Sequence, residues 1–221
     1  RYLSLPSLRR NGYYNDICAY YAIFYISLMN TLIENATFVC LDTETTGLTP
    51  DTGGKICEVA LLASRAQKRI ASYGTLINPQ VFIMPDVIAI HGITNEMVQD
   101  KPVFKDIAPK IRELLEGNVL ICHNADFDTK FLRHEFEQIG QSMPNCTILD
   151  TLKYARLHGH FKRNRLGLIA QELGVSSQGW HRAMADTIMT EKIFYYFLFK
   201  FKDMGARTLQ DLFNLQNRRC L

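Results

Sequence analysis

The order of strand-like and helical runs constrains the fold of this chain more than any other feature. The strand-like runs are 37–42, 56–64, 68–77, 118–123 and 146–151. The helical runs, recognised by apolar residues at helical spacing, are 102–117, 126–140, a run from Leu152, 165–175 and 182–201. Residues 78–87 contain two prolines and are predicted to be irregular. Three strands followed by strands alternating with helices predict an α/β fold with a mixed sheet.

The chain is long enough for one sizeable domain. It has 221 residues, of which 47% are hydrophobic, and this allows one full core. We expect a helical extension over 1–35, a main domain over 36–199 and a tail over 200–221. The tail has leucines at helical spacing, at Leu209, Leu212 and Leu215. It should form a short helix that docks back on the domain or binds a partner.

Residues 17–33 carry no charge and follow Arg9 and Arg10, a pattern with some likeness to a signal peptide or a membrane anchor. The segment is short for a membrane span and contains tyrosine, serine, asparagine and threonine. We therefore expect a helix that packs on the domain or on a second copy of the chain. A homodimer is one consequence of this hypothesis, and membrane association is the alternative.

Charge and cysteines place few limits on function. A net charge of +3 is compatible with a polyanionic partner but does not require one. The six cysteines include no Cys-x-x-Cys pair, which argues against a zinc cluster. Cys40 and Cys122 lie inside apolar strand-like runs, where a free thiol packs as a small hydrophobic group. We expect a reducing, cytoplasmic setting.

Two carboxylates end the first predicted strand, in the stretch "FVCLDTETTGL" over 38–48. Asp42 and Glu44 are two residues apart, so their side chains point to the same side of an extended strand. Two adjacent acids repel one another, and burial is costly unless a cation compensates. Either both acids are solvated at a strand end, or they bind a hard divalent cation through oxygen.

The stretch "CHNADFDTKFL" places further polar residues at the end of another predicted strand. His123 and Asn124 end the strand, and Asp126 and Asp128 fall in the first turns of the next helix. Helix capping and the helix dipole explain an acid such as Asp126. They explain Asp128 less well, because it flanks the side of the helix predicted to be buried.

A third stretch, "GWHRAMADTIMT", precedes and begins the last long helix. Asp186 lies on an otherwise apolar run, which is unfavourable unless the acid is paired or binds a metal. His181 is five residues earlier, and on a regular helix the two side chains would diverge. They converge only if His181 belongs to a mobile loop before the helix; otherwise His181 is a capping or surface residue.

Together, "LDTETTGL", "HNADFD" and "HRAMAD" resemble the three motifs of the DEDDh 3′-5′ exonucleases, the family of the DNA polymerase III epsilon proofreading subunit. Supporting similarity extends over residues 36–199 and includes His-Gly-Ile-Thr at 91–94. The resemblance implies a ribonuclease H-like fold with a five-stranded mixed sheet flanked by helices. It implies two Mg²⁺ or Mn²⁺ ions, on the order of 4 Å apart. The implied metal ligands are Asp42, Glu44, Asp128 and Asp186, and the implied general base is His181.

The same resemblance implies a substrate site. The turn after the first strand would receive the 3′ end of a nucleic acid, with Thr45 at the 3′-hydroxyl, Leu48 against the base, and Thr46 and Gly47 between them. His91, His123 and Phe127 match further positions near the substrate. Core packing is the alternative role for Phe127.

The run from Lys153 to Arg165 is rich in cations: Lys153, Arg156, His158, His160, Lys162, Arg163 and Arg165. Such a run is commonly a solvated face, but its place before the third motif also suits tracking of nucleic-acid phosphates.

The resulting prediction is an enzyme that hydrolyses single-stranded or frayed DNA from its 3′ end and releases nucleoside 5′-monophosphates. A DNA polymerase is a possible partner for such a protein. The alternatives are an RNA exonuclease of the ribonuclease T or oligoribonuclease kind and an inactive nucleic-acid-binding module.

Overall fold

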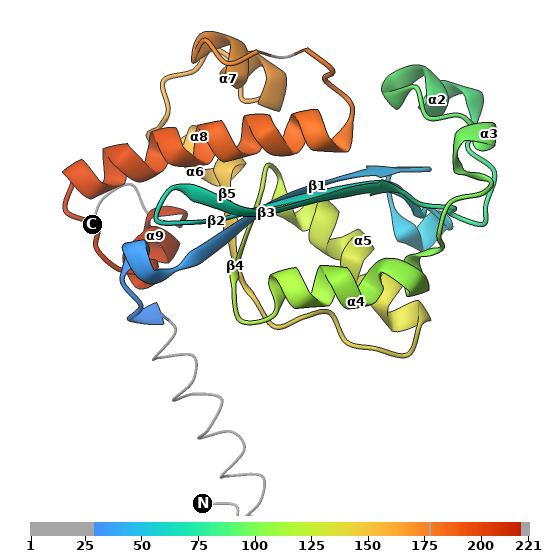
Figure 1. The fold of residues 1–221 in the computed structure, drawn as a ribbon. Coiled ribbons are helices and arrows are strands. Elements are labelled where there is room, and N and C mark those ends of the chain that lie inside the picture. The colour runs from blue at the N-terminus through green and yellow to red at the C-terminus, as the bar shows by residue number, and fades with distance from the viewer. Residues whose placement is uncertain (1–28, 177, 218–221) are drawn as a thin grey trace, which may run out of the picture.

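A computed structural model of the protein describes residues 29–176 and 178–217. Within them, five strands form one sheet in the order β3-β2-β1-β4-β5 (Figure 1). The strands are β1 (Thr37–Thr45), β2 (Ile56–Arg65), β3 (Lys68–Leu76), β4 (Val119–Cys122) and β5 (Thr147–Asp150). The first three pair antiparallel, whereas β4 is parallel to β1 and to β5. The predicted five-stranded mixed sheet is confirmed.

Helices cover both faces of the sheet (Figure 1). The helices of the main layers are α4 (Phe104–Leu115), α5 (Ala125–Gln138), α6 (Thr151–His158), α7 (Leu166–Glu172), α8 (Ala183–Asp203) and α9 (Leu209–Leu215). Successive residues of β1 face opposite layers. Phe38 and Cys40 belong to the core beneath α8, and Val39 and Leu41 belong to the core over α4 and α5. This alternation places Asp42 and Glu44 on one face and Thr43 on the other, before the shift in register between Glu44 and Thr45.

The segment after β3 is more regular than predicted. Residues 78–87 were expected to be irregular, but α2 (Pro85–His91) begins within them and α3 (Asn95–Val98) follows. Pro85 stands at the first helical position, where the missing N–H has no helical partner in any case. Ile83, Ile93 and Val98 form a small core with Cys57 of β2. The proline that suggested irregularity therefore starts a helix.

The C-terminal helix α9 packs into the domain. Leu209, Leu212 and Leu215 are each at most 1% exposed. The Tyr154 hydroxyl donates to the backbone oxygen of Leu212 at 2.9 Å, and His158 Nε2 lies 2.7 Å from the backbone oxygen of Leu215. His158 is therefore a buried contact to the tail, and its inclusion in a cationic surface run was wrong.

The chain enters the described fold beside α9. The Leu209 N–H donates to the Thr31 oxygen at 3.0 Å, and the Ile33 N–H donates to the Arg207 oxygen at 2.9 Å. A short 3₁₀ turn, η1 (Ile33–Asn35), leads into β1. Most of the helix expected over 17–33 lies outside the described residues. Among those that are described, no helix has the length and apolar character needed to cross a membrane.

Candidate active site

The carboxyl end of β1 projects beyond its parallel neighbour. β4 pairs with Phe38, Val39 and Cys40 only, so Asp42 and Glu44 lie past the end of β4. Both have the same alternation as Phe38 and Cys40, which places them on the face covered by α8. In open α/β sheets, the carboxyl ends of neighbouring strands form the crevice where ligands bind.

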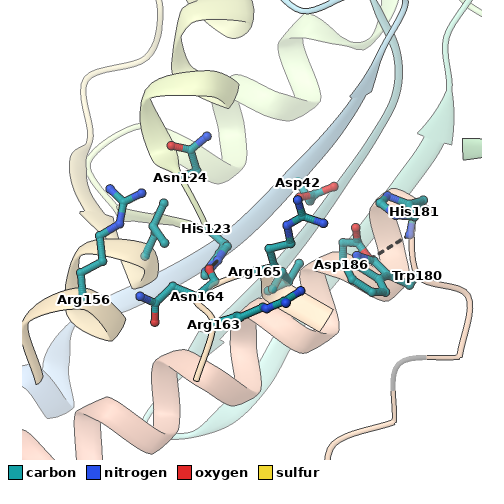
Figure 2. Close-up of a pocket in the computed structure, with 12 residues that line it drawn as sticks. Asp42, His123, Asn124, Arg156, Arg163, Asn164, Arg165, Trp180, His181 and Asp186 are labelled. Carbon is teal, nitrogen blue, oxygen red and sulfur yellow. Dashed lines mark hydrogen bonds between the residues drawn. The ribbon is translucent and has the colours of Figure 1, made fainter. Parts of the chain in front are cut away.

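Asp186 completes a cluster with these two acids. It lies in the first turn of α8, the helix that covers the Asp42 face. One ligand oxygen from each of Asp42, Glu44 and Asp186 lies within 4.8 Å of the other two. Asp42 and Asp186 also line a common cavity (Figure 2). Three residues from two of the predicted motifs therefore meet at one point.

Asp128 approaches the cluster from the other side of the sheet. It lies in the first turn of α5, and its side chain is 3% exposed. Its Oδ1 accepts hydrogen bonds from the Thr43 N–H at 3.0 Å and from the Thr43 hydroxyl at 2.8 Å. Thr43 points to the α5 face, opposite to Asp42. Asp128 is thus adjacent to the cluster of Asp42, Glu44 and Asp186 without belonging to it, whereas Asp126 is exposed.

The cluster has a strong excess of negative charge. Burial raises the pKa of Asp42 well above its ordinary value, and the charges of Asp128, Asp186 and Glu44 raise it further. Burial is also the main cause that raises the pKa of Glu44 to about 8, with Asp186 and Glu58 contributing. It raises the pKa of Asp128 and that of Asp186 to about 7. The residues that the structure describes do not neutralise these four carboxylates.

A hard divalent cation fits this arrangement. Mg²⁺ and Mn²⁺ prefer carboxylate oxygens, and a bound cation stabilises the charged form of each acid. The oxygens of Asp42, Glu44 and Asp186 are close enough to share an ion, and within the described part of the chain burial and mutual repulsion outweigh the stabilisation of their charged forms. Asp42, Glu44 and Asp186 are the residues that could hold a metal directly, with Asp128 next to them.

His181 precedes α8 at the edge of the same cavity. Its backbone adopts a φ of 67°, and its N–H donates to Asp186 Oδ1 at 3.3 Å (Figure 2). The imidazole is exposed and stacks on Trp180, with ring centroids 4.9 Å apart. Trp180 in turn rests on Gly167 of α7, where an added Cβ would lie 2.6 Å from the indole ring. His181 is thus outside the helix, as its convergence with Asp186 requires.

Sequence reasoning missed the pair that holds this loop to the sheet. Glu58 of β2 is 8% exposed and lies opposite Glu44 in the sheet register. Its carboxylate accepts from Arg182 Nη2 at 2.7 Å, from Arg182 Nε at 3.1 Å and from the Ala183 N–H at 2.9 Å. These bonds anchor the residues on the C-terminal side of His181. A charged residue inside the apolar run "ICEVALL" was the signal that could have revealed Glu58.

For the hydrolysis that the three motifs predict, with His181 as the base, we expect Glu58→Gln to lower the rate by roughly 10- to 100-fold, because small displacements of a reacting group cost that much. The amide cannot accept all three hydrogen bonds, so His181 loses its anchor and the fold loses about 1–3 kcal/mol. The measurement is kcat, KM and thermal stability, and kcat should fall more than KM rises.

Glu191 supplies a matched control for Glu58. Glu191 of α8 forms a similar pair with Arg69 of β3, at 2.5 Å. The side chains of Glu191 and Arg69 are 7% and 45% exposed, and those of Glu58 and Arg182 are 10% and 43% exposed. Glu191→Gln should lower stability and leave kcat unchanged. Equal losses of kcat in the two variants would contradict an anchoring role specific to Glu58.

His123 lies in the same cavity, as its motif suggested. Its Nδ1 is 2.9 Å from the Thr151 hydroxyl, and its Nε2 is 2.9 Å from the backbone oxygen of Asn164. Burial lowers the pKa of the imidazole. With both ring nitrogens engaged, His123 fastens the loop before α7 to the end of β4.

The turn after β1 presents Leu48 to solvent, with 88% of that residue exposed. The Thr45 hydroxyl is buried and donates to the Gly47 oxygen at 2.7 Å. The Thr46 hydroxyl accepts from the Lys55 N–H at 3.0 Å. The structure therefore ties both threonines into the turn and leaves Leu48 as its free apolar group.

His91 and Phe127 are packed more deeply than a position against substrate suggests. His91 is 5% exposed; its Nδ1 accepts from the Ile93 N–H at 3.0 Å, and its Nε2 lies 3.9 Å from Cys57 Sγ. Phe127 packs on Phe131 with ring centroids 5.1 Å apart, at the border of the core over α5. Neither lines the cavity that contains Asp42 and Asp186.

Comparison with known proteins identifies the family of this chain. The sequence model of the exonuclease family matches residues 39–194. The PolC-type DNA polymerase III of Caldanaerobacter subterraneus subsp. tengcongensis is 32% identical over 176 residues, which are 79% of this chain and 12% of that protein. The DNA polymerase III epsilon subunit of Pasteurella multocida is 33% identical over 159 residues, which are 67% of this chain and 62% of that protein.

A solved structure of Exonuclease X in complex with 5′ overhanging duplex DNA matches with a TM-score of 0.63 at 24% identity. The match covers 81% of this chain and 99% of that chain, and it confirms the predicted ribonuclease H-like architecture. The two polymerase relatives are longer than this chain, which spans only 12% and 62% of their lengths. The chain belongs to the exonuclease family, and the resemblance to DEDDh exonucleases drawn from its three motifs is confirmed.

Proposed function

We propose that the protein is a 3′-5′ exonuclease that removes nucleoside 5′-monophosphates from the 3′ end of single-stranded or frayed DNA. The observation that carries this proposal is the cluster of Asp42, Glu44 and Asp186, whose ligand oxygens lie within 4.8 Å of one another. The described residues do not fully compensate their charge, and the exposed His181 bonds to Asp186 through its backbone N–H. This is the set of groups that metal-dependent phosphodiester hydrolysis requires.

Two Mg²⁺ or Mn²⁺ ions are the proposed cofactors. Asp42, Glu44 and Asp186 would hold them directly, and Asp128 would be the fourth ligand, through the carboxylate oxygen that does not bond to Thr43. Four carboxylates balance the charge of two divalent ions. When bound, the ions would supply Lewis-acid stabilisation of the scissile phosphate and of the departing 3′ oxygen.

His181 is the proposed general base. A ring nitrogen takes a proton from the attacking water, the water oxygen forms a bond to phosphorus, and the bond from phosphorus to the 3′ oxygen breaks. The departing 3′ oxygen takes a proton from solvent, so the products are a nucleoside 5′-monophosphate and a strand with a new 3′-hydroxyl. The backbone hydrogen bond to Asp186 holds residue 181 at the edge of the cavity, and stacking on Trp180 at 4.9 Å orients the imidazole ring.

The turn from Thr45 to Leu48 is the proposed place for the terminal nucleotide. Leu48 offers an exposed apolar surface for the base. The Thr45 hydroxyl would exchange its hydrogen bond to Gly47 for one to the 3′-hydroxyl, and Thr46 and Gly47 shape the turn. For His91, His123 and Phe127, the observed contacts support an indirect role, in which they support the surfaces that the substrate touches.

Burial and repulsion among the acids give a test of metal binding that does not need substrate. Carboxyl groups with ordinary pKa values of 3.8 and 4.5 reach about 7 to 8 in the fold. The metal-free folded state then binds more protons than the unfolded state across this range, so its stability falls as pH rises from about 4 to about 8. Mg²⁺ should reverse the loss.

Thermal unfolding in EDTA and in Mg²⁺, at several pH values and constant ionic strength, measures this effect. We expect the increase in melting temperature caused by Mg²⁺ to be larger at pH 8 than at pH 6, because protons compete with the metal at the lower pH. A melting temperature that Mg²⁺ leaves unchanged at pH 8 would contradict the proposed metal site.

RNA is the second candidate substrate, because one matching structure is the nuclease domain of 3′hExo bound to rAMP. DNA is favoured by the relatives named as DNA polymerase III. Hydrolysis of matched single-stranded DNA and RNA oligomers, with Mg²⁺ and with Mn²⁺, decides between them. Faster cleavage of DNA supports the proposal, and faster cleavage of RNA overturns the choice of substrate. Binding without cleavage in either metal would identify an inactive binding module instead.

The proposal extends to partners and location. A DNA polymerase is the proposed partner, because the relatives are named as polymerase III proteins. A homodimer through residues 17–33 is testable by light scattering of the full chain. A reducing, cytoplasmic location agrees with Cys40, Cys57, Cys122 and Cys146, which are all free thiols.

A further inference from the structure

In the structure, some side chains of the cationic run before the third motif line the cavity of the site and others do not. Arg156, Arg163 and Arg165 line the cavity that holds Asp42 and Asp186, and its volume is about 890 Å³ (Figure 2). Lys162 is exposed but does not line the cavity. Position along the sequence therefore does not decide which cations face the site, and the fold selects the three arginines.

Within 29–176 and 178–217, no acidic side chain pairs with these three arginines. All three residues are exposed, and none takes part in an ion pair among the described residues. In particular, no ion pair joins them to the acids of the cluster, so they do not serve as its counter-charges. Guanidinium groups that share a cavity and lack carboxylate partners are suited to bind phosphate.

The loop that carries two of them is held in place. Arg163 and Arg165 flank Asn164, whose backbone oxygen lies 2.9 Å from His123 Nε2. The other nitrogen of His123 is 2.9 Å from Thr151 Oγ1 at the start of α6, the helix that carries Arg156. One chain of hydrogen bonds thus links the supports of all three arginines, which lowers the entropic cost of binding an extended ligand.

The position of the cavity indicates which part of a strand the arginines would meet. The cavity extends from Asp42 and Asp186 past His123 to Arg156, and none of the residues from Thr45 to Leu48 lines it. If the terminal nucleotide occupies the turn, the strand on the other side of the scissile bond lies along the cavity. A volume near the upper end of the roughly 300–1,000 Å³ typical of ligand sites leaves room for more than one phosphate.

We propose that Arg156, Arg163 and Arg165 bind the backbone phosphates of the nucleotides on the 5′ side of the scissile bond. This inference rests on the proposed exonuclease function, since that function defines the scissile bond. The arginines then set how much of the strand the enzyme holds between successive cleavages. Contacts to phosphate alone do not depend on base sequence.

The test combines two measurements on the triple variant Arg156→Gln/Arg163→Gln/Arg165→Gln. The first is binding of a labelled oligothymidylate in EDTA at salt concentrations from roughly 50 to 200 mM. Each phosphate contact contributes about 0.7 to the slope of log affinity against log salt for single strands, so the triple variant should lose about 2 from the slope. Lys162→Gln is the matched control, and its slope should equal that of the wild type.

The second measurement compares hydrolysis of the oligonucleotide with hydrolysis of the p-nitrophenyl ester of thymidine 5′-monophosphate, which has a single phosphate. The triple variant should lose kcat/KM on the oligonucleotide by a much larger factor than on the ester. An unchanged salt slope, or equal losses on the two substrates, would overturn the proposal. If the wild type hydrolyses neither substrate, the exonuclease proposal fails, and with it the assignment of the arginines to the 5′ side of a scissile bond.

Discussion

Asp42→Ala is expected to abolish hydrolysis, with a loss of at least about 10³-fold, or roughly 4 kcal/mol of transition-state stabilisation. Asp42 lies at the centre of the acidic cluster, where Asp128, Asp186 and Glu44 all act on its pKa. Without it, the remaining acids cannot hold a divalent ion in the same position. Steady-state hydrolysis of a single-stranded oligonucleotide in Mg²⁺ measures the loss.

Stability distinguishes this loss from misfolding. Removing a buried carboxylate that its neighbours repel should not lower the melting temperature of the metal-free protein at pH 8. The stabilisation by Mg²⁺ should disappear in the same variant. Asp126→Ala, in which an exposed acid of the neighbouring motif is removed, is the control and should behave as the wild type. Retained hydrolysis in Asp42→Ala would contradict the mechanism.

His181→Ala is expected to slow hydrolysis by roughly 10²- to 10⁴-fold, the usual contribution of a general base. His181 is exposed at the edge of the cavity, and its imidazole makes no metal contact in the proposed mechanism. Stabilisation by Mg²⁺ should therefore persist in this variant, in contrast to Asp42→Ala. Hydrolysis rates and melting temperatures with and without Mg²⁺ separate the two roles.

His160 provides the control for His181. It is exposed, it lies in the loop between α6 and α7, and it does not line the cavity. His160→Ala should keep the wild-type rate. If His181→Ala also keeps that rate, the base is another group; if it loses the stabilisation by Mg²⁺, His181 supports the metal site instead.

The sequence predicted the sheet well because local patterns determine it. The apolar runs that became β1, β2 and β4 are 4 to 10 residues long and nearly fully buried. Their burial on both faces follows from helices above and below the sheet. The start of α2 was missed because a proline was taken as a sign of irregular structure, although a proline also suits the first turn of a helix.

The site was predicted in part. Asp42 and Glu44 stood out as paired acids at the end of an apolar strand, and Asp186 as an acid in an apolar helical run; the structure brings the three together. Asp128 stood out because it flanks the buried side of its helix, but the sequence did not reveal that it lies on the opposite side of the sheet and bonds to Thr43. The position of Asp128 depends on how α5 packs against β1, and local sequence patterns do not determine that packing.

The features of the site that the sequence did not reveal depend on contacts between segments that are distant along the chain. Glu58 and Arg182 are 124 residues apart, and only the fold shows that they pair. Likewise, the division of the cationic run into arginines that line the cavity and a histidine buried against α9 follows from tertiary packing. A single sequence shows which residues are unusual, whereas the partners of those residues become visible in three dimensions.

Polarity of degradation tests the central claim most directly. The same single-stranded DNA is labelled at its 5′ end in one sample and at its 3′ end in another, and both are followed over time in Mg²⁺ and in EDTA. We expect the 3′ label to be released first as a mononucleotide and the 5′-labelled strand to shorten stepwise. EDTA should stop both processes. Early release of the 5′ label, internal fragments, or cleavage in EDTA would contradict that claim.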